Sequence, residues 1–232
     1  MIIAIDGPAG SGKTTTAREV ARALGYQYID TGAMYRAIAL AFLREGIPFT
    51  EEAARAFLPK LHLDLQPSEE GLRVLLNGED VTEAIRLPEV SRAASQVSAL
   101  KAVREALVPI QRRIAKKFEQ MYGGVVIDGR DIGTVVFPDA DVKVFMVAST
   151  EVRARRRYEE LKRQGKDVRY EDVLQEILER DRRDTERAIS PLRKAPDAVE
   201  LDTTNMSIED QVQFVLNLVE ERQKGKNVTH KL

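Results

Sequence analysis

The architecture of this chain can be inferred from one segment, Gly7-Pro8-Ala9-Gly10-Ser11-Gly12-Lys13-Thr14. It matches G-x-x-x-x-G-K-[ST], the pattern of a loop whose backbone N–H groups surround a phosphate. An apolar run precedes the loop at Ile2–Ile5 and a helical pattern follows it at Lys13–Leu24, so the positive end of a helix would face the anion. The segment predicts nucleotide binding through residues 7–15, with Lys13 reaching the β- and γ-phosphates. Thr14 is the expected Mg²⁺ ligand, and its neighbour Thr15 could replace it.

Short apolar runs alternate with helical patterns along the rest of the chain. The runs are Tyr26–Asp30, Gly124–Asp128, Val142–Val147 and Ala198–Asp202. Such runs are typical of strands buried on both faces of a parallel sheet. With Ile2–Ile5 they make five candidate strands, and their alternation with helices predicts βαβ units.

One region departs from this alternation. Leu61–Leu65 alternates apolar and polar residues, Leu72–Leu76 follows, and Asn77-Gly78 is a hairpin turn signal. Residues 60–85 are therefore predicted to form a small antiparallel insert. Residues 88–119 are predicted to be helical, with a break or kink at Pro109.

The composition excludes several classes of protein. The 232 residues carry 36 Lys and Arg against 37 Asp and Glu, and a net charge of -1 does not suit a dedicated nucleic-acid or membrane-surface protein. There are no cysteines and two histidines, which excludes a disulfide framework and a Cys nucleophile and disfavours a Ser-His-Asp triad. No apolar run approaches a membrane span, and Met1–Gly7 resembles a strand rather than a signal peptide. We expect a cytoplasmic protein, monomeric by default, with no nucleic-acid or membrane partner.

Three further segments narrow the function. They are Asp30-Thr31-Gly32-Ala33-Met34-Tyr35-Arg36, Asp128-Gly129-Arg130-Asp131-Ile132-Gly133 and Arg180-Asp181-Arg182-Arg183-Asp184-Thr185-Glu186-Arg187. Together with the glycine-rich loop they resemble the bacterial cytidylate kinases, a family of P-loop nucleoside-monophosphate kinases, and the likeness runs from Ile3 to about Val219. The resemblance implies transfer of a phosphoryl group from ATP to CMP or dCMP, with Mg²⁺. This sequence departs from the family in two small ways. The family often has Ser at the position of Thr31, and Gly or Ser at the position of Thr14.

The resemblance also implies the fold and its division. It implies an α/β, three-layer P-loop kinase fold with a five-stranded parallel sheet core, the antiparallel insert and a short helical lid. The phosphate-loop core would comprise residues 1–35, 86–150 and 190–232. The monophosphate-binding region would comprise residues 36–85, with the insert at about 60–85, and the lid with its flanking helices residues 151–189.

Elementary chemistry agrees with a monophosphate kinase. Both reactants are anions, so the protein must position them and neutralise their charge rather than supply a strong base. The chain has 24 Arg against 12 Lys, and Arg binds phosphate bidentately while keeping its charge. Arg180, Asp184 and Arg187 share one helix face, since they are spaced four and three residues apart. Arg36 and Arg130 follow strand ends, where open α/β sheets bind ligands.

The resemblance assigns roles to these residues. It implies that Arg36, Arg130 and Arg187 hold the CMP phosphate, that Arg180 and Asp184 lie at the sugar, and that Thr31 contributes its hydroxyl to substrate binding. Cytosine offers an N4 amino donor with acceptors at N3 and O2. The family places Asp131, Arg104 and Ser95 against these groups, and uracil could not satisfy Asp131.

Two more assignments concern the donor side. Arg153, Arg155, Arg156 and Arg157 match the family's lid, whose arginines close over the ATP phosphates. Arg153 and Arg157 are the favoured pair because they share a face, although spacing alone does not settle which side chains point inward. Asp128 ends a strand beside the loop strand and is a candidate to hold Mg²⁺ through water, or alternatively to cap the following loop.

Other functions stay open at this level. A related P-loop kinase could act on another monophosphate or on a non-nucleotide hydroxyl. A regulatory GTPase is disfavoured because N-K-x-D is absent and no D-x-x-G follows the loop. A nucleic-acid-binding module is disfavoured by the neutral charge balance. The preference between CMP and dCMP does not follow from the sequence.

Overall fold

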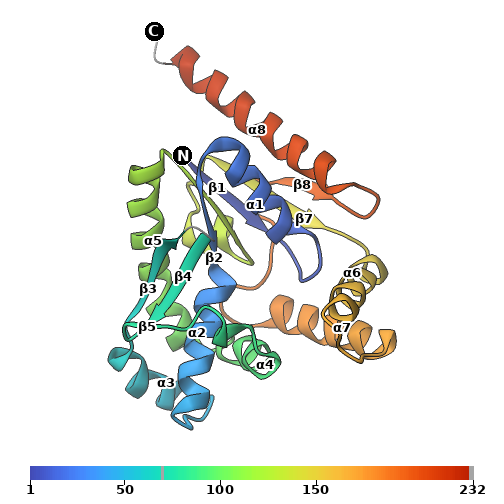
Figure 1. Cartoon of the computed structure of the whole chain (residues 1–232). Helices are drawn as coiled ribbons and strands as arrows, with labels where there is room; N and C mark the ends of the chain where they lie inside the picture. Colours follow the sequence, from blue (N-terminus) through green and yellow to red (C-terminus); the bar gives the residue numbers. More distant parts are fainter. Residues whose placement is uncertain (69–70, 230–232) are drawn as a thin grey trace.

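The computed structural model describes residues 1–68 and 71–229 (Figure 1). Its central sheet has five parallel strands in the order β2-β6-β1-β7-β8. The strands are β1 Ile2–Asp6, β2 Gln27–Asp30, β6 Val125–Gly129, β7 Val142–Val147 and β8 Val199–Asp202. All five predicted strands are confirmed to within one residue at either end, and their parallel pairing confirms the predicted α/β fold.

Alternate side chains of β1 enter two separate cores. Ile2 and Ala4 join one buried cluster, and Ile3 and Ile5 join another on the opposite face of the sheet. The first face is covered by α2 Thr31–Arg44, α4 Pro88–Val97 and α5 Lys101–Tyr122, and the second by α1 Lys13–Leu24 and α8 Ile208–Thr229. Helices on both faces produce the three layers that the family resemblance implies.

The predicted insert is a three-stranded antiparallel sheet in the order β3-β4-β5. Its strands are β3 Leu63–Ser68, β4 Gly71–Leu76 and β5 Glu79–Asp80. Asn77 and Gly78 both have positive φ, as their turn requires. Leu63, Leu65 and Val74 are buried in the same core as α2 and α5, so the insert rests on the main body of the molecule. The short helix α3 Glu51–Phe57 and a turn at Leu58–Lys60 lead into it.

The helical region 88–119 does not break at Pro109, one of the two outcomes predicted there. The chain breaks at residues 98–100, between α4 and α5, and α5 continues through Pro109. Proline removes one N–H donor to the carbonyl four residues earlier, that of Glu105. Glu105 is exposed to solvent. Water can therefore replace the missing donor there, so the proline does not end the helix.

The helices α6 Thr150–Arg163 and α7 Tyr170–Glu186 form a hairpin that projects to one side of the sheet, away from the insert (Figure 1). Together they correspond to the region expected to act as a lid. Between β6 and β7, a single π-helical turn covers Ile132–Val136. Within the described residues, no helix combines the length and hydropathy that a membrane crossing requires.

Candidate nucleotide-binding site

The glycine-rich loop connects β1 to the first turn of α1. Gly12 precedes the helix with φ of 91°, a left-handed conformation that glycine adopts without strain. A Cβ on Gly10 would lie 2.9 Å from Cβ of Arg153, so the absence of a side chain lets α6 approach the loop. Pro8 and Ala9 lie between Gly7 and Gly10, and their carbonyls accept hydrogen bonds from Lys13 and Arg153. Ser11 is fully buried, and its carbonyl accepts a hydrogen bond from Thr203 at 2.8 Å.

Lys13 is a buried cation near other cations. Its Nζ donates to the carbonyl of Pro8 at 3.0 Å, and its exposed fraction is 6%. Burial, and then the neighbouring Arg130, lowers the pKa of Lys13 to about 7. A phosphate at the loop would reverse this shift, because an adjacent anion favours the charged amine. The site is therefore electrostatically prepared for an anion.

Thr14 and Asp128 meet beside the loop. The Thr14 hydroxyl donates to Asp128 Oδ2 at 2.7 Å, and the Tyr28 hydroxyl donates to Oδ1 at 3.0 Å. Burial, and then the proximity of Asp30, raises the pKa of Asp128. A hydroxyl and a carboxylate at the edge of a phosphate loop are the oxygen ligands that Mg²⁺ uses with nucleotides, so these residues fit that ion. Thr15 is exposed and lies one residue further along the helix.

A cavity opens beside the loop and encloses about 620 Å³ including its mouth. All nine residues predicted to bind the second substrate line it: Thr31, Arg36, Ser95, Arg104, Arg130, Asp131, Arg180, Asp184 and Arg187. They come from α2, α4, α5, α7 and the loop after β6. Five arginines and two aspartates line the cavity, an excess of three positive charges. Such a cavity suits an anionic ligand.

One end of the cavity is polar but only partly saturated. Arg104 forms a buried ion pair with Asp131 and donates to the carbonyl of Ser98 at 3.1 Å. The Tyr35 ring lies 5.3 Å from the Arg104 guanidinium. Ser95 Oγ is buried and has no hydrogen-bond partner among the described residues. A carboxylate, a guanidinium and a free hydroxyl thus converge where a ligand with both donors and acceptors would fit.

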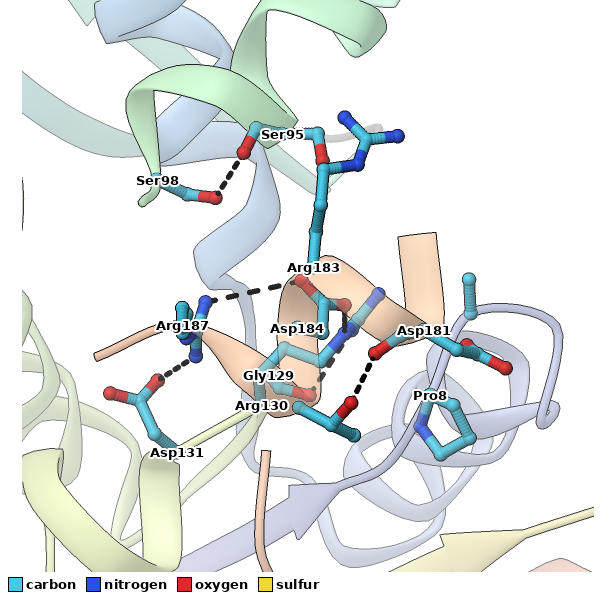
Figure 2. A network of polar contacts seen from close by, with 12 residues as sticks. Pro8, Ser95, Ser98, Gly129, Arg130, Asp131, Asp181, Arg183, Asp184 and Arg187 are labelled. Atoms are coloured by element: carbon cyan, nitrogen blue, oxygen red, sulfur yellow. Dashed lines mark hydrogen bonds and ion pairs between the residues drawn. The ribbon is translucent and has the colours of Figure 1, made fainter. Parts of the chain in front are cut away.

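The other end gathers guanidinium groups around Asp184. Arg130 Nε donates to Asp184 Oδ2 at 2.8 Å, and Arg187 lies between Asp131 and Asp184, 4.0 Å from each (Figure 2). Arg180 Nε is buried without a hydrogen-bond partner among the described residues. Burial, reinforced by Arg130, lowers the pKa of Arg180 to about 10. These guanidinium groups exceed their counter-charges, and a bound phosphate would supply the missing negative charge.

Arg36 and Thr31 are held by the ends of β2 and β6. Arg36 pairs with Asp30 at 2.7 Å, and the Thr31 hydroxyl donates to the carbonyl of Asp128 at 2.7 Å. Asp30 also caps α2 by accepting from the N–H of Ala33. Burial opposes ionisation of Asp30, but Arg36 holds its pKa below the ordinary value.

The two favoured lid arginines have different surroundings. Arg153 is buried, donates to the carbonyl of Ala9 at 3.1 Å and forms a bidentate pair with Asp181. Arg157 is 40% exposed and pairs with Glu160 on its own helix. Their contacts differ because Arg153 is in the first turn of α6, which abuts the loop, whereas Arg157 is one turn further away.

Several residues of the site received no role in the sequence analysis. Asp30 and Asp181 orient Arg36 and Arg153, and Tyr35 lines the cavity. All three lie inside the segments 30–36 and 180–187 that resemble the family, but neither the spacing nor the resemblance assigned them a role. Asp6 is buried at the end of β1 and binds backbone N–H groups of the loop after β6. No local pattern indicates that contact, because its partners are 126 and 127 residues away.

Comparisons with known proteins agree with one another. The family model described as cytidylate kinase matches residues 3–221. The chain is similar to a cytidylate kinase from Salinibacter ruber, with 51% identity over 219 residues, covering 94% of this chain and 96% of that protein. It is also similar to one from Bacillus subtilis, with 49% identity over 223 residues, covering 96% and 97%. A solved structure from Thermus thermophilus, 18% identical, covers 95% of this chain and 96% of its own with a TM-score of 0.50, which indicates a shared fold only.

Proposed function

The chain belongs to the cytidylate kinase family, and from that membership we infer that it transfers the γ-phosphoryl group of ATP to CMP or dCMP. The products are ADP with CDP or dCDP. The enzyme is thus a nucleoside-monophosphate kinase, a phosphotransferase whose acceptor is itself a phosphate.

One observation supports the placement of the acceptor: the cavity has three excess positive charges, and its Arg130, Arg180 and Asp184 interact electrostatically with Lys13 of the phosphate loop. We propose that the loop, residues 7–15, holds the phosphates of ATP and that this cavity holds the monophosphate. Their close placement follows from the pairing of β1 with β6, which ends with Asp6 opposite Gly129. Donor and acceptor would meet at the carboxyl edge of these two strands.

Arg36, Arg130 and Arg187 are proposed to grip the phosphate of CMP. A phosphate oxygen of CMP attacks Pγ of ATP in line, and the bond from Pγ to the β,γ-bridging oxygen breaks. The acceptor is already ionised, so no strong general base is required. Lys13 with Arg130 and Arg187 would neutralise charge that two repelling anions bring together. Preorganised guanidinium groups do this without reorientation during the reaction.

Base selection is proposed for the opposite end of the cavity. Asp131 would accept a hydrogen bond from N4 of cytosine, and Arg104 and Ser95 would donate toward N3 and O2. Uracil presents a carbonyl oxygen at position 4, which would leave the buried Asp131 carboxylate facing an acceptor. An unmatched buried polar group gives strong rejection. Arg180 and Asp184 would lie at the sugar.

Thr14 is the proposed direct ligand of Mg²⁺, with Asp128 holding it through water. When bound there, the ion shields the β- and γ-phosphate charges. Thr14 and Asp128 already share a hydrogen bond of 2.7 Å, so the two oxygen atoms proposed to hold the ion are in one place. Thr15 is the proposed substitute if Thr14 is removed.

The lid is proposed to close over the phosphates through Arg153 and Arg157. Closure would exclude water, which otherwise competes with CMP for the γ-phosphoryl group. Arg153 already contacts the phosphate loop, and Arg157 would have to exchange Glu160 for a phosphate.

The test offers ATP together with CMP, dCMP, UMP or AMP and measures ADP formation. We expect CMP and dCMP to be used with a kcat/KM well above that for UMP and AMP. Preference for AMP or UMP would overturn the base assignment. The monomeric state and the cytoplasmic location remain predictions from the sequence.

A further inference from the structure

Asp6 is a buried carboxylate that lies outside the cavity. It ends β1, immediately before the phosphate loop, and its exposed fraction is 5%. Its Oδ1 accepts from the N–H of Ile132 at 2.8 Å, and its Oδ2 accepts from the N–H of Gly133 at 2.7 Å. Both carboxylate oxygens are thus engaged by consecutive N–H groups of one distant loop.

Those N–H groups begin the π-helical turn Ile132–Val136, which directly follows Asp131. Short π-helical turns are rare in proteins, and those that occur are often located at functional sites. Its far end is fixed as well, since Arg112 of α5 donates to the carbonyls of Val135 and Val136, each at 2.8 Å. The turn is therefore held at both ends by charged side chains, with Asp6 at the end nearer the base-reading residue.

We propose that Asp6 is a positioning residue for base selection: by binding the two N–H groups after Asp131, it sets where the Asp131 carboxylate lies in the cavity. This inference rests on the proposed function of Asp131. Asp6 is not among the cavity-lining residues, and its two hydrogen bonds to the turn go to backbone N–H groups. Asp131, immediately before this turn, pairs with Arg104 and lies 4.0 Å from Arg187, so a shift of the backbone would move the Asp131 carboxylate relative to both arginines.

The ionised form of Asp6 is required for this role. A carboxylate accepts hydrogen bonds at both oxygens, whereas an amide or a protonated carboxyl presents one acceptor fewer. Negative charge at the start of a helical turn is also favourable. Burial raises the pKa of Asp6 to about 6, even though the two N–H groups oppose the shift. Three charged groups interact with Asp6: Asp131, which raises its pKa further, Lys13, which lowers it, and Arg130, whose own pKa is raised in part by Asp6.

The first test is Asp6→Asn, which keeps the size of the side chain and removes one acceptor. We expect KM for CMP to rise and the ratio of kcat/KM for CMP over UMP to fall about 10-fold, because small displacements of positioned groups cost this much or more. KM for ATP should change less than about 2-fold, because the substitution removes no proposed contact between ATP and the phosphate loop. An unchanged CMP:UMP ratio would overturn the proposal, as would a parallel rise of KM for ATP and CMP.

Asp141→Asn is the matched control. Asp141 accepts from the N–H of Ile2 at 2.7 Å, so it makes the same kind of contact at the opposite end of β1. This variant should keep the CMP:UMP ratio of the unmodified enzyme, even if its melting temperature falls. A ratio that drops equally in both variants would reduce Asp6 to a general structural role.

The second test uses pH and does not depend on the folding of a variant. CMP and UMP carry the same phosphate, so the ionisation of the phosphate cancels in their ratio. In the unmodified enzyme the ratio should fall between pH 7.5 and 5 with a midpoint near 6, as Asp6 becomes protonated. In Asp6→Asn it should be low and constant. A flat ratio in the unmodified enzyme, or an unchanged midpoint in the variant, would overturn the proposal. An unmodified enzyme that does not prefer CMP at neutral pH would instead overturn the proposed function.

Discussion

Lys13 illustrates how a single residue of the site is balanced between stability and function. Its charged form is disfavoured by burial and by Arg130 until an anion arrives, so the pKa of Lys13 is about 7 in place of 10.5. We expect such a cation to destabilise the ligand-free protein and, in the proposed function, to strengthen binding of the negatively charged substrate. The same environment would then have opposite consequences for folding and for catalysis.

Lys13→Met is expected to lower kcat by at least about 100-fold, the typical loss when one preorganised charge-stabilising group is removed. It should also raise the melting temperature of the ligand-free enzyme. The folded pKa lies below the unfolded value, so folding is penalised fully below pH 7, and the penalty vanishes as pH rises to about 10.5. The rise in melting temperature caused by Lys13→Met should accordingly shrink between pH 7 and 10, which thermal unfolding at several pH values would measure.

A gain in stability that is constant with pH would contradict the electrostatic explanation for Lys13. Lys117→Met provides a comparison, because Lys117 is exposed on α5 and remote from the phosphate loop. It should change neither kcat nor the pH dependence of unfolding.

Asp131→Ala should lower the preference for CMP over UMP by about 10- to 100-fold, the discrimination that one good base contact provides. The affinity for ATP should change little. The removal also leaves Arg104 buried without its partner, so a loss of stability is expected alongside. Competition assays with both monophosphates give the ratio, and Asp139→Ala, at an exposed position later in the same loop, is the control. An undiminished preference for CMP would reject the assignment.

At the scale of single elements, the strands were predictable and one helix boundary was not. Strands such as Val125–Gly129 are buried on both faces, and their continuous apolar runs directly reflect that environment. Of the two outcomes predicted at Pro109, a break is wrong because α5 continues through it, and local propensity could not decide this since it does not register that Glu105 is exposed. The contacts of Arg153 and Arg157 likewise depend on where the first turn of α6 meets Gly10, which spacing within one helix does not reveal.

Arg153 and Arg157 should therefore differ in their effect on the lid. Arg153→Ala removes charge-assisted hydrogen bonds to Asp181 and to the carbonyl of Ala9, and should destabilise the ligand-free enzyme by about 2 kcal/mol. Arg157→Ala removes a surface pair with Glu160 and should change stability by less than about 0.5 kcal/mol. Urea unfolding measures both values. Equal losses in the two variants would show that the first turn of α6 is not specially anchored.

At the scale of the whole molecule, the convergence of the site could not be derived from spacing alone. Arg104 and Asp131 are 27 residues apart, and Arg130 and Asp184 are 54 apart, yet each pair is in contact. The resemblance to a family supplied these residues together, and the structure places all nine on one cavity. Asp6, which the resemblance did not single out, was invisible until the fold brought β1 beside the turn after β6.

The arrangement of the elements also predicts how the enzyme protects bound ATP from hydrolysis. The hairpin of α6 and α7 and the insert lie on opposite sides of the molecule (Figure 1), and both should move inward when ATP and CMP are bound together. ATP hydrolysis without CMP should be at least about 100-fold slower than phosphoryl transfer, because water is not held in line. Small-angle scattering should show compaction with both nucleotides. Equal ATP turnover with and without CMP would refute this shielding.

The strands β1 and β6 end in register, and this matters for any redesign of the enzyme. Asp6 stands opposite Gly129 across the ladder, so the turns that follow them leave the sheet at the same height. In the proposed placement of ATP and CMP, lengthening either turn by one residue would alter the gap that the phosphoryl group must cross. Efforts to retarget the enzyme to another nucleobase should therefore exchange side chains and preserve both turn lengths. Insertions and fusion tags are better placed at the remote Asn77-Gly78 corner, where the catalytic spacing is not at stake.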